Sequence, residues 1–138
     1  DFRISTPDAR FGVPIAKTLG NCLSAGNVAW LVAHLGINIV KRMLLLAELV
    51  TAPELLKQGY LLATYPAESL EIEANQLAER LMKLAPITQK SSKLTLARII
   101  KNNLPDCSDL IRECYGSEDF KNGVSAFLDG KPPVWTGK

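Results

Sequence analysis

The sequence of 138 residues has little of the residues from which metal centres and disulfide frameworks are built. It contains one histidine, His34, and three cysteines, Cys22, Cys107 and Cys114, which are an odd number and include no Cys-x-x-Cys pair. Zinc sites need closely spaced cysteine and histidine ligands, and disulfide-stabilised domains need paired cysteines. We therefore expect neither a metal site nor a disulfide framework, and the cysteine content favours a reduced, intracellular protein.

The chain also lacks an excess of charge of either sign and a long hydrophobic run. Its 16 basic and 14 acidic residues are interspersed and give a formal net charge of +2, so no field is built that would attract nucleic acid or anionic lipid. The most apolar window, residues 28–40, is interrupted by His34, Gly36 and Asn38 and is too short to span a bilayer. No basic segment followed by an apolar one opens the chain. We expect a soluble, cytoplasmic protein with no nucleic-acid or membrane partner.

The hydrophobic content of 47% is ample for the core of one domain. Residue 1 is Asp, and residues 2–5 alternate between apolar and polar as a half-buried strand does, with no turn before them. A lone strand has no sheet to pair with, which favours a fragment of a longer chain. A processed or tag-cleaved terminus is the alternative.

The stretch that organises the chain is residues 9–24. Gly12 and Pro14 prevent a continuous helix there, so an extended segment must turn through a loop before the helices begin. Such a loop is a place where a ligand can approach the backbone.

Caps and apolar spacing predict seven helices after this loop. Ser24 is a good N-cap for a helix that ends at Gly36, and Asn38 is expected to cap the second. Thr51 and Glu54 are typical of a capping box for a short third helix that ends at Gly59. The second helix carries three consecutive leucines at residues 44–46, which predicts that it is covered on more than one side.

The second half of the chain is expected to be helical after one short extended piece at residues 60–65. The predicted helices there cover residues 69–84, 87–102, 105–116 and 117–128, followed by a tail whose prolines exclude a helix. The helix at residues 87–102 has two apolar faces, which indicates a partner surface in addition to a core.

Three motifs carry a family resemblance: Ala-Arg-Phe-Gly-Val-Pro at residues 9–14, Thr-Ala with a following glycine at residues 51–59, and the Phe-Lys-Asn-Gly-Val-Ser-Ala-Phe-Leu run at residues 120–128. In this order and at these distances, the chain resembles the crotonase (enoyl-CoA hydratase/isomerase) superfamily. The resemblance implies a mainly α fragment, the C-terminal half of the α/β crotonase spiral fold. Residues 1–66 would end the spiral core, and residues 67–138 would form the helical trimerisation region and tail.

The resemblance also implies a function. Members of the family bind acyl-CoA thioesters, and the expected activity is that of an enoyl-CoA hydratase/isomerase, a lyase that adds water to 2-enoyl-CoA. The family's upstream half carries a Gly-Gly-Gly-x-x-Leu segment whose backbone N–H groups complete an oxyanion hole, and this chain has no such segment. Because one such donor contributes about 10²–10³ in rate, we expect the isolated chain to be inactive. A non-catalytic helical assembly module is the alternative.

Further expectations concern partners. The resemblance implies no cofactor, since coenzyme A is part of the substrate, and a homo-oligomer, a trimer or hexamer in the full-length protein. No catalytic residue is predicted within the chain. The residues expected to bind substrate are Phe11, Pro14, Ile15, Leu19, Lys121, Lys131 and Trp135.

Ile15 stands where most hydratases of the family carry a catalytic glutamate. It could be a wall of the acyl pocket, since such pockets are mainly apolar, or it could mark different chemistry or none. In a third possibility, the loop is shifted and a nearby acid such as Asp8 or Glu48 substitutes. For Lys121 and Lys131 an ordinary exposed surface role is the alternative, and for Trp135 simple packing of the tail.

Overall fold

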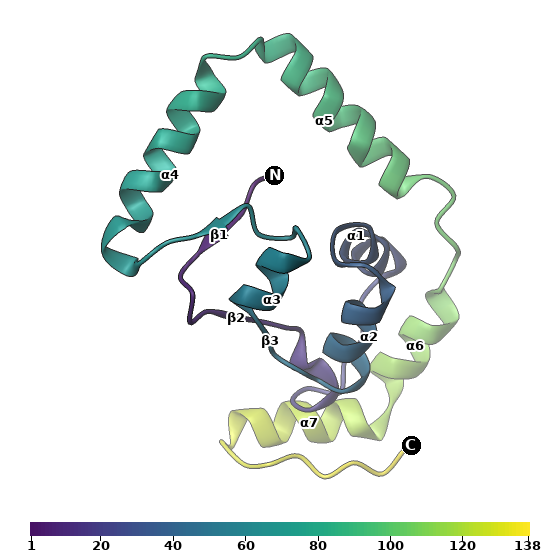
Figure 1. Ribbon diagram of the computed structural model, residues 1–138. Helices are drawn as coiled ribbons and strands as arrows, with labels where there is room; N and C mark the ends of the chain where they lie inside the picture. The colour runs from purple at the N-terminus through teal and green to yellow at the C-terminus, as the bar shows by residue number, and fades with distance from the viewer. The chain divides into compact units, whose positions relative to one another are not determined.

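A computed structural model describes all 138 residues, and its regular structure is mostly helical (Figure 1). The expected mainly α class with seven α-helices is confirmed. In chain order the elements are β1 (Ile4–Ser5), β2 (Arg10–Phe11), the 3-10 helix η1 (Pro14–Ala16), α1 (Ala25–Leu35), α2 (Ile37–Leu45), β3 (Val50–Thr51), α3 (Ala52–Lys57), β4 (Ala63–Thr64), α4 (Ala67–Met82), α5 (Pro86–Lys101), α6 (Ser108–Gly116) and α7 (Glu118–Leu128).

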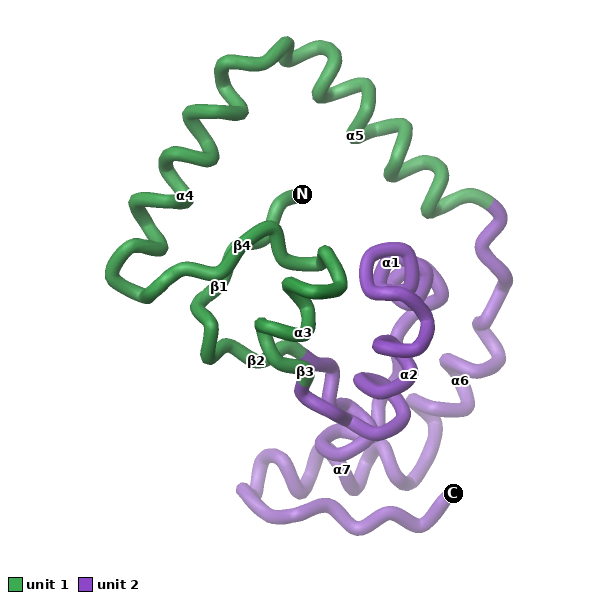
Figure 2. The backbone as a smooth tube through the Cα atoms, viewed as in Figure 1, with its two compact units in different colours: residues 1–11, 50–102 green, residues 12–49, 103–138 purple.

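The chain forms two compact units, each built from two segments (Figure 2). The first unit consists of Asp1–Phe11 and Val50–Asn102, and the second unit of Gly12–Leu49 and Asn103–Lys138. Each unit therefore joins parts that are distant in the sequence.

The first unit holds two short pairs of strands. β1 pairs in parallel with β4, with Ile4 opposite Ala63, and β2 pairs antiparallel with β3, with Arg10 opposite Thr51. The sequence predicted β1 and an extended piece near β4, and both are present. It did not predict β2 and β3, because two-residue strands show no alternation and are defined by a partner far along the chain.

The core of the first unit forms around α3. Val50, Ala52, Leu55 and Leu61 are each 2% exposed or less. The start of α3 differs from the prediction, since the Thr51 side chain makes no capping hydrogen bond. Thr51 has the extended backbone usual for an N-cap, with φ −80° and ψ 154°, but its hydroxyl accepts no bond from the first turn of α3, so this half of the expected capping box is absent.

The helices α4 and α5 expose apolar side chains along their length. Gln89 Nε2 donates to the Leu81 carbonyl across the turn between them at 3.0 Å. Large exposed residues on the two helices include Ile72, Met82, Ile87, Leu96 and Ile99. No helix of the chain combines the length and the apolar character needed to cross a lipid bilayer.

The second unit is built on the pair α1 and α2. Ser24 caps α1 as predicted, its hydroxyl accepting from Asn27 N at 3.3 Å. The predicted cap at Asn38 is wrong: Gly36, with φ +74°, both ends α1 and begins α2, so no linker separates the two helices. The core residues of this pair are Leu35, Ile39, Val40 and Met43.

The other side of α2 is not covered in this chain. Leu45 and its neighbour Leu46 are each 73% exposed, so the residues of this chain do not supply the second covered side that was expected. The turn that follows is tight, because Ala47 adopts a positive φ of 51°.

The last two helices close the second unit. α6 begins at Ser108 rather than at the predicted residues 105–106, because the Asp106 carboxylate accepts from Ser108 N at 3.0 Å and holds a turn ahead of the helix. Ser117 caps α7 as predicted, accepting from Phe120 N at 3.0 Å. The tail after α7 has no regular structure, also as predicted.

Candidate functional site

The loop predicted to organise the chain is a closed, hydrogen-bonded turn, which we call the η1 loop (residues 12–20). The Pro14 carbonyl accepts from Lys17 N at 3.0 Å and from Thr18 N at 3.1 Å, and the Thr18 hydroxyl donates to it at 3.0 Å. The Ile15 carbonyl accepts from Gly20 N at 2.8 Å. These bonds fix the backbone on both sides of the half-buried Ile15 side chain.

The start of the η1 loop rests on the segment that follows α2. A Cβ on Gly12 would lie 2.7 Å from the Glu48 carbonyl oxygen and 2.7 Å from Leu49 Cδ2, so only glycine permits this approach. Glu48 is held in turn by Arg42, whose Nε and Nη2 donate to its two carboxylate oxygens at 2.8 and 2.6 Å. The Arg42–Glu48 pair therefore supports the loop.

Neither acid that could replace the missing carboxylate is suited to the task. The hydrogen bond from Arg42 lowers the pKa of Glu48, and both of its oxygens are engaged. The pKa of Asp8, in the first unit, is also lowered, chiefly by a hydrogen bond with Thr6. A general base works best with a pKa near the operating pH, so lowered values argue against a substitute at either position.

The end of the η1 loop packs against α7. A Cβ on Gly123 would overlap the Leu19 backbone, at 2.6 Å from the carbonyl carbon and closer still to its oxygen. Gly123 is buried. The helix and the loop backbone are thus in direct contact, and α7 holds the loop in place.

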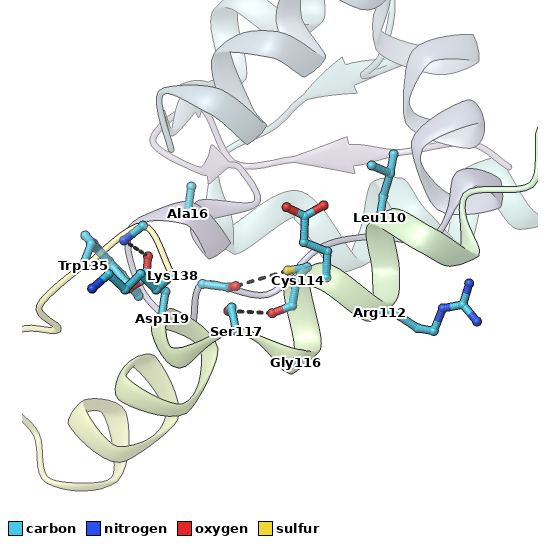
Figure 3. Close-up of a pocket in the computed structure, with 12 residues that line it drawn as sticks. Ala16, Leu110, Arg112, Cys114, Gly116, Ser117, Asp119, Trp135 and Lys138 are labelled. Carbon is cyan, nitrogen blue, oxygen red and sulfur yellow. Dashed lines mark hydrogen bonds between the residues drawn. The ribbon is translucent and has the colours of Figure 1, made fainter.

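A pocket of about 750 Å³ opens within the second unit beside this loop, which we call the tail pocket (Figure 3). The loop contributes Ala16 and Gly20, and the remaining walls come from α6, the start of α7 and the tail. The residues of these walls are Leu110, Arg112, Glu113, Cys114, Gly116, Ser117, Asp119, Trp135, Gly137 and Lys138.

Asp119 fixes the tail against the first turn of α7. Its Oδ1 accepts from the Thr136 amide at 2.5 Å and hydroxyl at 2.9 Å, and its Oδ2 accepts from Gly137 N at 2.9 Å. The backbone amide of Thr136 is the leading cause of a lowered pKa at Asp119, which keeps the carboxylate ionised. The amides of Glu118 and Asp119 donate to the Lys138 carbonyl at 2.8 and 3.2 Å.

This anchoring places Trp135 against the η1 loop. A Cβ on Gly20 would lie 2.9 Å from Trp135 Cζ3, so the indole covers the glycine closely. Gly20 also has φ +66°, a conformation that other residues rarely adopt. Both features require glycine at this position.

The structure brings together four of the residues predicted from the sequence. Pro14, Ile15, Leu19 and Trp135 lie in the second unit, three of them on the η1 loop, and Trp135 lines the tail pocket. Phe11 lies in β2 of the first unit, where its ring packs edge-on against the Tyr60 ring, with the two ring centroids 6.3 Å apart.

The two predicted lysines do not line the tail pocket. Lys121 is exposed on α7, and Lys131 is exposed and forms an ion pair with Asp129 at 3.3 Å. The sequence did not identify Asp119 and Cys114, which do line it. The N-cap at Ser117 predicts that Asp119 lies in the first turn of a helix. No sequence pattern predicts that the tail folds back onto Asp119.

The family comparison matches the whole chain. The sequence model described as "Enoyl-CoA hydratase/isomerase" matches residues 1–138. The 2,3-dehydroadipyl-CoA hydratase of Escherichia coli is 27% identical over 142 residues, covering 100% of this chain and 55% of that protein. The short-chain-enoyl-CoA hydratase of Clostridium acetobutylicum is 27% identical over 133 residues, covering 94% of this chain and 51% of that protein.

Solved structures share the fold over the full chain. Methylmalonyl-CoA decarboxylase in complex with 2-nitronate-propionyl-CoA aligns with a TM-score of 0.91 and 25% identity, covering 100% of this chain and 55% of that one. Carnitinyl-CoA hydratase from Mycobacterium avium aligns with a TM-score of 0.80 and 30% identity, with the same coverage of 100% and 55%. The chain therefore spans about half the length of the proteins that it matches.

Proposed function

Because this chain belongs to the enoyl-CoA hydratase/isomerase family, we propose that it forms part of an acyl-CoA-binding enzyme that adds water to a 2-enoyl-CoA thioester. The observation that carries the proposal is the family match over residues 1–138. It is supported by relatives named as hydratases of dehydroadipyl-CoA and of short-chain enoyl-CoA.

In this proposal the chain is the C-terminal half of the enzyme and supplies structure around the acyl group. Residues 1–66 end the spiral core, and residues 67–138 form the helical assembly region and tail. The η1 loop, with Pro14, Ile15 and Leu19, forms an apolar wall for the acyl chain, and the substrate role of Phe11, which lies in the first unit, stays a separate prediction. Ile15 cannot transfer a proton, so the general base and the amides that stabilise the developing enolate come from polypeptide outside these residues.

We assign the nucleotide end of the thioester to the region of α7 and the tail. Trp135 offers an aromatic surface, and Lys121 and Lys131 offer exposed positive charge. No cofactor is needed, because coenzyme A is itself part of the substrate. The cytoplasmic location expected from the cysteine content stays a prediction.

We also propose that the full protein is a homo-oligomer, a trimer or hexamer. The support is the row of exposed apolar side chains on α4 and α5, among them Met82 at 76% and Ile87 at 74% exposed. Apolar surface of this extent favours association. Sedimentation at micromolar concentration should show an oligomer, and a clean monomer would count against this assignment.

The experiment that tests the acyl pocket compares saturated thioesters of different length, which bind without reacting. In the full-length protein, Ile15→Ala should increase the preference for octanoyl-CoA over butyryl-CoA by about tenfold, since pocket volume of this size discriminates by 1–3 kcal/mol. Ile37→Ala is the matched control, because Ile37 is 55% exposed at the start of α2. An unchanged preference in Ile15→Ala would remove Ile15 from the pocket, and failure of every thioester to bind would refute the function.

The second candidate is a non-catalytic helical assembly module. It is favoured by Ile15, which removes one expected carboxylate, and by the exposed faces of α5. The upstream polypeptide separates the two: an intact glycine segment followed by a carboxylate supports the enzyme, and a degenerate segment supports the module.

A further inference from the structure

Two cysteines that are distant in the sequence meet inside the second unit. Cys22 follows the η1 loop, and Cys114 lies on α6. Cys114 Sγ donates to the Gly20 carbonyl at 3.3 Å, and the hydroxyl of its neighbour Tyr115 donates to the Cys22 carbonyl at 3.3 Å. Two hydrogen bonds therefore hold the α6 backbone and the end of the loop together at this point.

The Cys22 side chain also affects the Cys114 thiol. Burial raises the pKa of Cys114 to about 11, and a hydrogen bond with the Cys22 side chain is the next cause. Both residues are half-buried, so each is partly open to solvent, and Cys114 also lines the open tail pocket. All three cysteines of the chain are reduced in this structure.

We propose that Cys22 and Cys114 are a reversible disulfide site that joins α6 to the end of the η1 loop. This site is independent of the proposed acyl-CoA chemistry. No group of three or more His, Cys, Asp or Glu side chains suited to a metal ion is present, so the pair has no third ligand that would make it a metal site. Two partly exposed cysteines on segments that are hydrogen-bonded to each other are suited to thiol–disulfide exchange.

The reaction with oxidised glutathione has two steps. The Cys22 thiolate attacks one sulfur of glutathione disulfide, which breaks its S–S bond and releases one glutathione thiolate. Cys114 loses its proton and attacks the Cys22 sulfur of the mixed disulfide, which forms the Cys22–Cys114 bond and releases a second glutathione. Both cysteine sulfurs are oxidised, and the two protons that they lose are taken up by the two glutathione thiolates.

The raised pKa of Cys114 determines the order of these steps. A thiol must ionise to act as a nucleophile, and Cys114 ionises rarely at neutral pH. Cys22 is therefore the residue expected to form the mixed disulfide, and Cys114 the residue that resolves it. Cys107, the third cysteine, lies at the start of α6 and provides an internal control.

The test equilibrates the purified chain in a glutathione redox buffer, traps free thiols by alkylation and maps disulfide-linked peptides by mass spectrometry. The wild-type chain and Cys107→Ser should lose two hydrogens and yield a peptide that links Cys22 with Cys114. Cys114→Ser should stop at glutathionylated Cys22. Circular dichroism of the reduced variants confirms that each one folds.

A denatured sample separates native geometry from chance pairing. In concentrated urea, loop closure favours the short Cys107–Cys114 ring, because closure entropy grows with the number of residues enclosed. The folded chain should instead form Cys22–Cys114. Pairing of Cys107 in the folded chain, or three separately alkylated cysteines at oxidising equilibrium, would overturn the proposal.

Discussion

The contact between α7 and the η1 loop gives a sharp prediction for Gly123→Ala. At an ordinary helix position this change increases stability by about 1 kcal/mol, because alanine has the higher helix propensity. Here the new Cβ would lie 2.6 Å from the Leu19 carbonyl carbon and 3.1 Å from its Cα. The neighbour is backbone and cannot rotate away, so either the helix or the loop must shift.

The cost of overpacking and the gain in helix propensity together determine the expected change in the free energy of unfolding. Overpacking of a closed site costs about 1–3 kcal/mol, and contact with rigid backbone belongs at the upper end of that range. Subtracting the propensity gain of about 1 kcal/mol leaves a loss of about 2 kcal/mol in the free energy of unfolding. A loss of this size changes the folding equilibrium constant by about thirtyfold.

Urea unfolding followed by tryptophan fluorescence measures this loss in the relevant part of the chain. Both tryptophans, Trp30 and Trp135, lie in the second unit. The matched control is Gly26→Ala in α1, where the new Cβ would lie 3.7 Å from Leu104 Cδ1, an ordinary contact. We expect a lower midpoint for Gly123→Ala and an equal or higher one for Gly26→Ala. A Gly123→Ala chain as stable as wild type would refute the argument that α7 holds the loop.

Three further predictions concern residues of the tail pocket. Asp119→Ala removes the acceptor of three hydrogen bonds, so the amides of Thr136 and Gly137 should lose hydrogen-exchange protection while α6 keeps its own; unchanged protection in the tail would contradict the anchoring role. Raising the pKa of Cys114 from 9.0 to about 11 lowers its thiolate fraction about 100-fold at neutral pH, so iodoacetamide should label it about 100-fold more slowly in the folded than in the urea-unfolded chain. The Cys114 thiol loses its proton at a lower pH in the unfolded chain than in the folded chain. The free energy of unfolding should therefore fall as pH rises from about 9 towards 11. Equal labelling rates in the two states, or stability that rises over this interval, would contradict the assignment.

Local chemistry explains what could be predicted from the sequence. The caps at Ser24 and Ser117 were predicted correctly, because a hydroxyl that accepts from the third amide ahead needs nothing beyond its own turn. The prediction that Asn38 caps α2 failed because Gly36, with its positive φ, already turns the chain and is itself the N-cap residue of that helix. At the start of α2 the glycine, which comes first along the chain, determined where the helix begins.

Contacts between distant segments could not be predicted in this way. Nothing near Cys114 indicates that it reaches Gly20, and nothing near Asp119 indicates that it holds Thr136. The segments β2 and β3 are strands only because they pair with each other across a long separation in the sequence. The tail pocket is made of such contacts, so the sequence identified Trp135 as a candidate without the residues that position it.

The central proposal is that this chain is part of an enzyme acting on 2-enoyl-CoA whose catalytic groups lie outside residues 1–138. The most direct measurement follows the loss of the enoyl-thioester absorbance of crotonyl-CoA with the full-length protein and with the isolated chain at equal concentration. We expect hydration by the full-length protein and none above the uncatalysed rate by the isolated chain. Comparable turnover by the 138-residue chain, or no turnover of any 2-enoyl-CoA by the full-length protein, would contradict the claim.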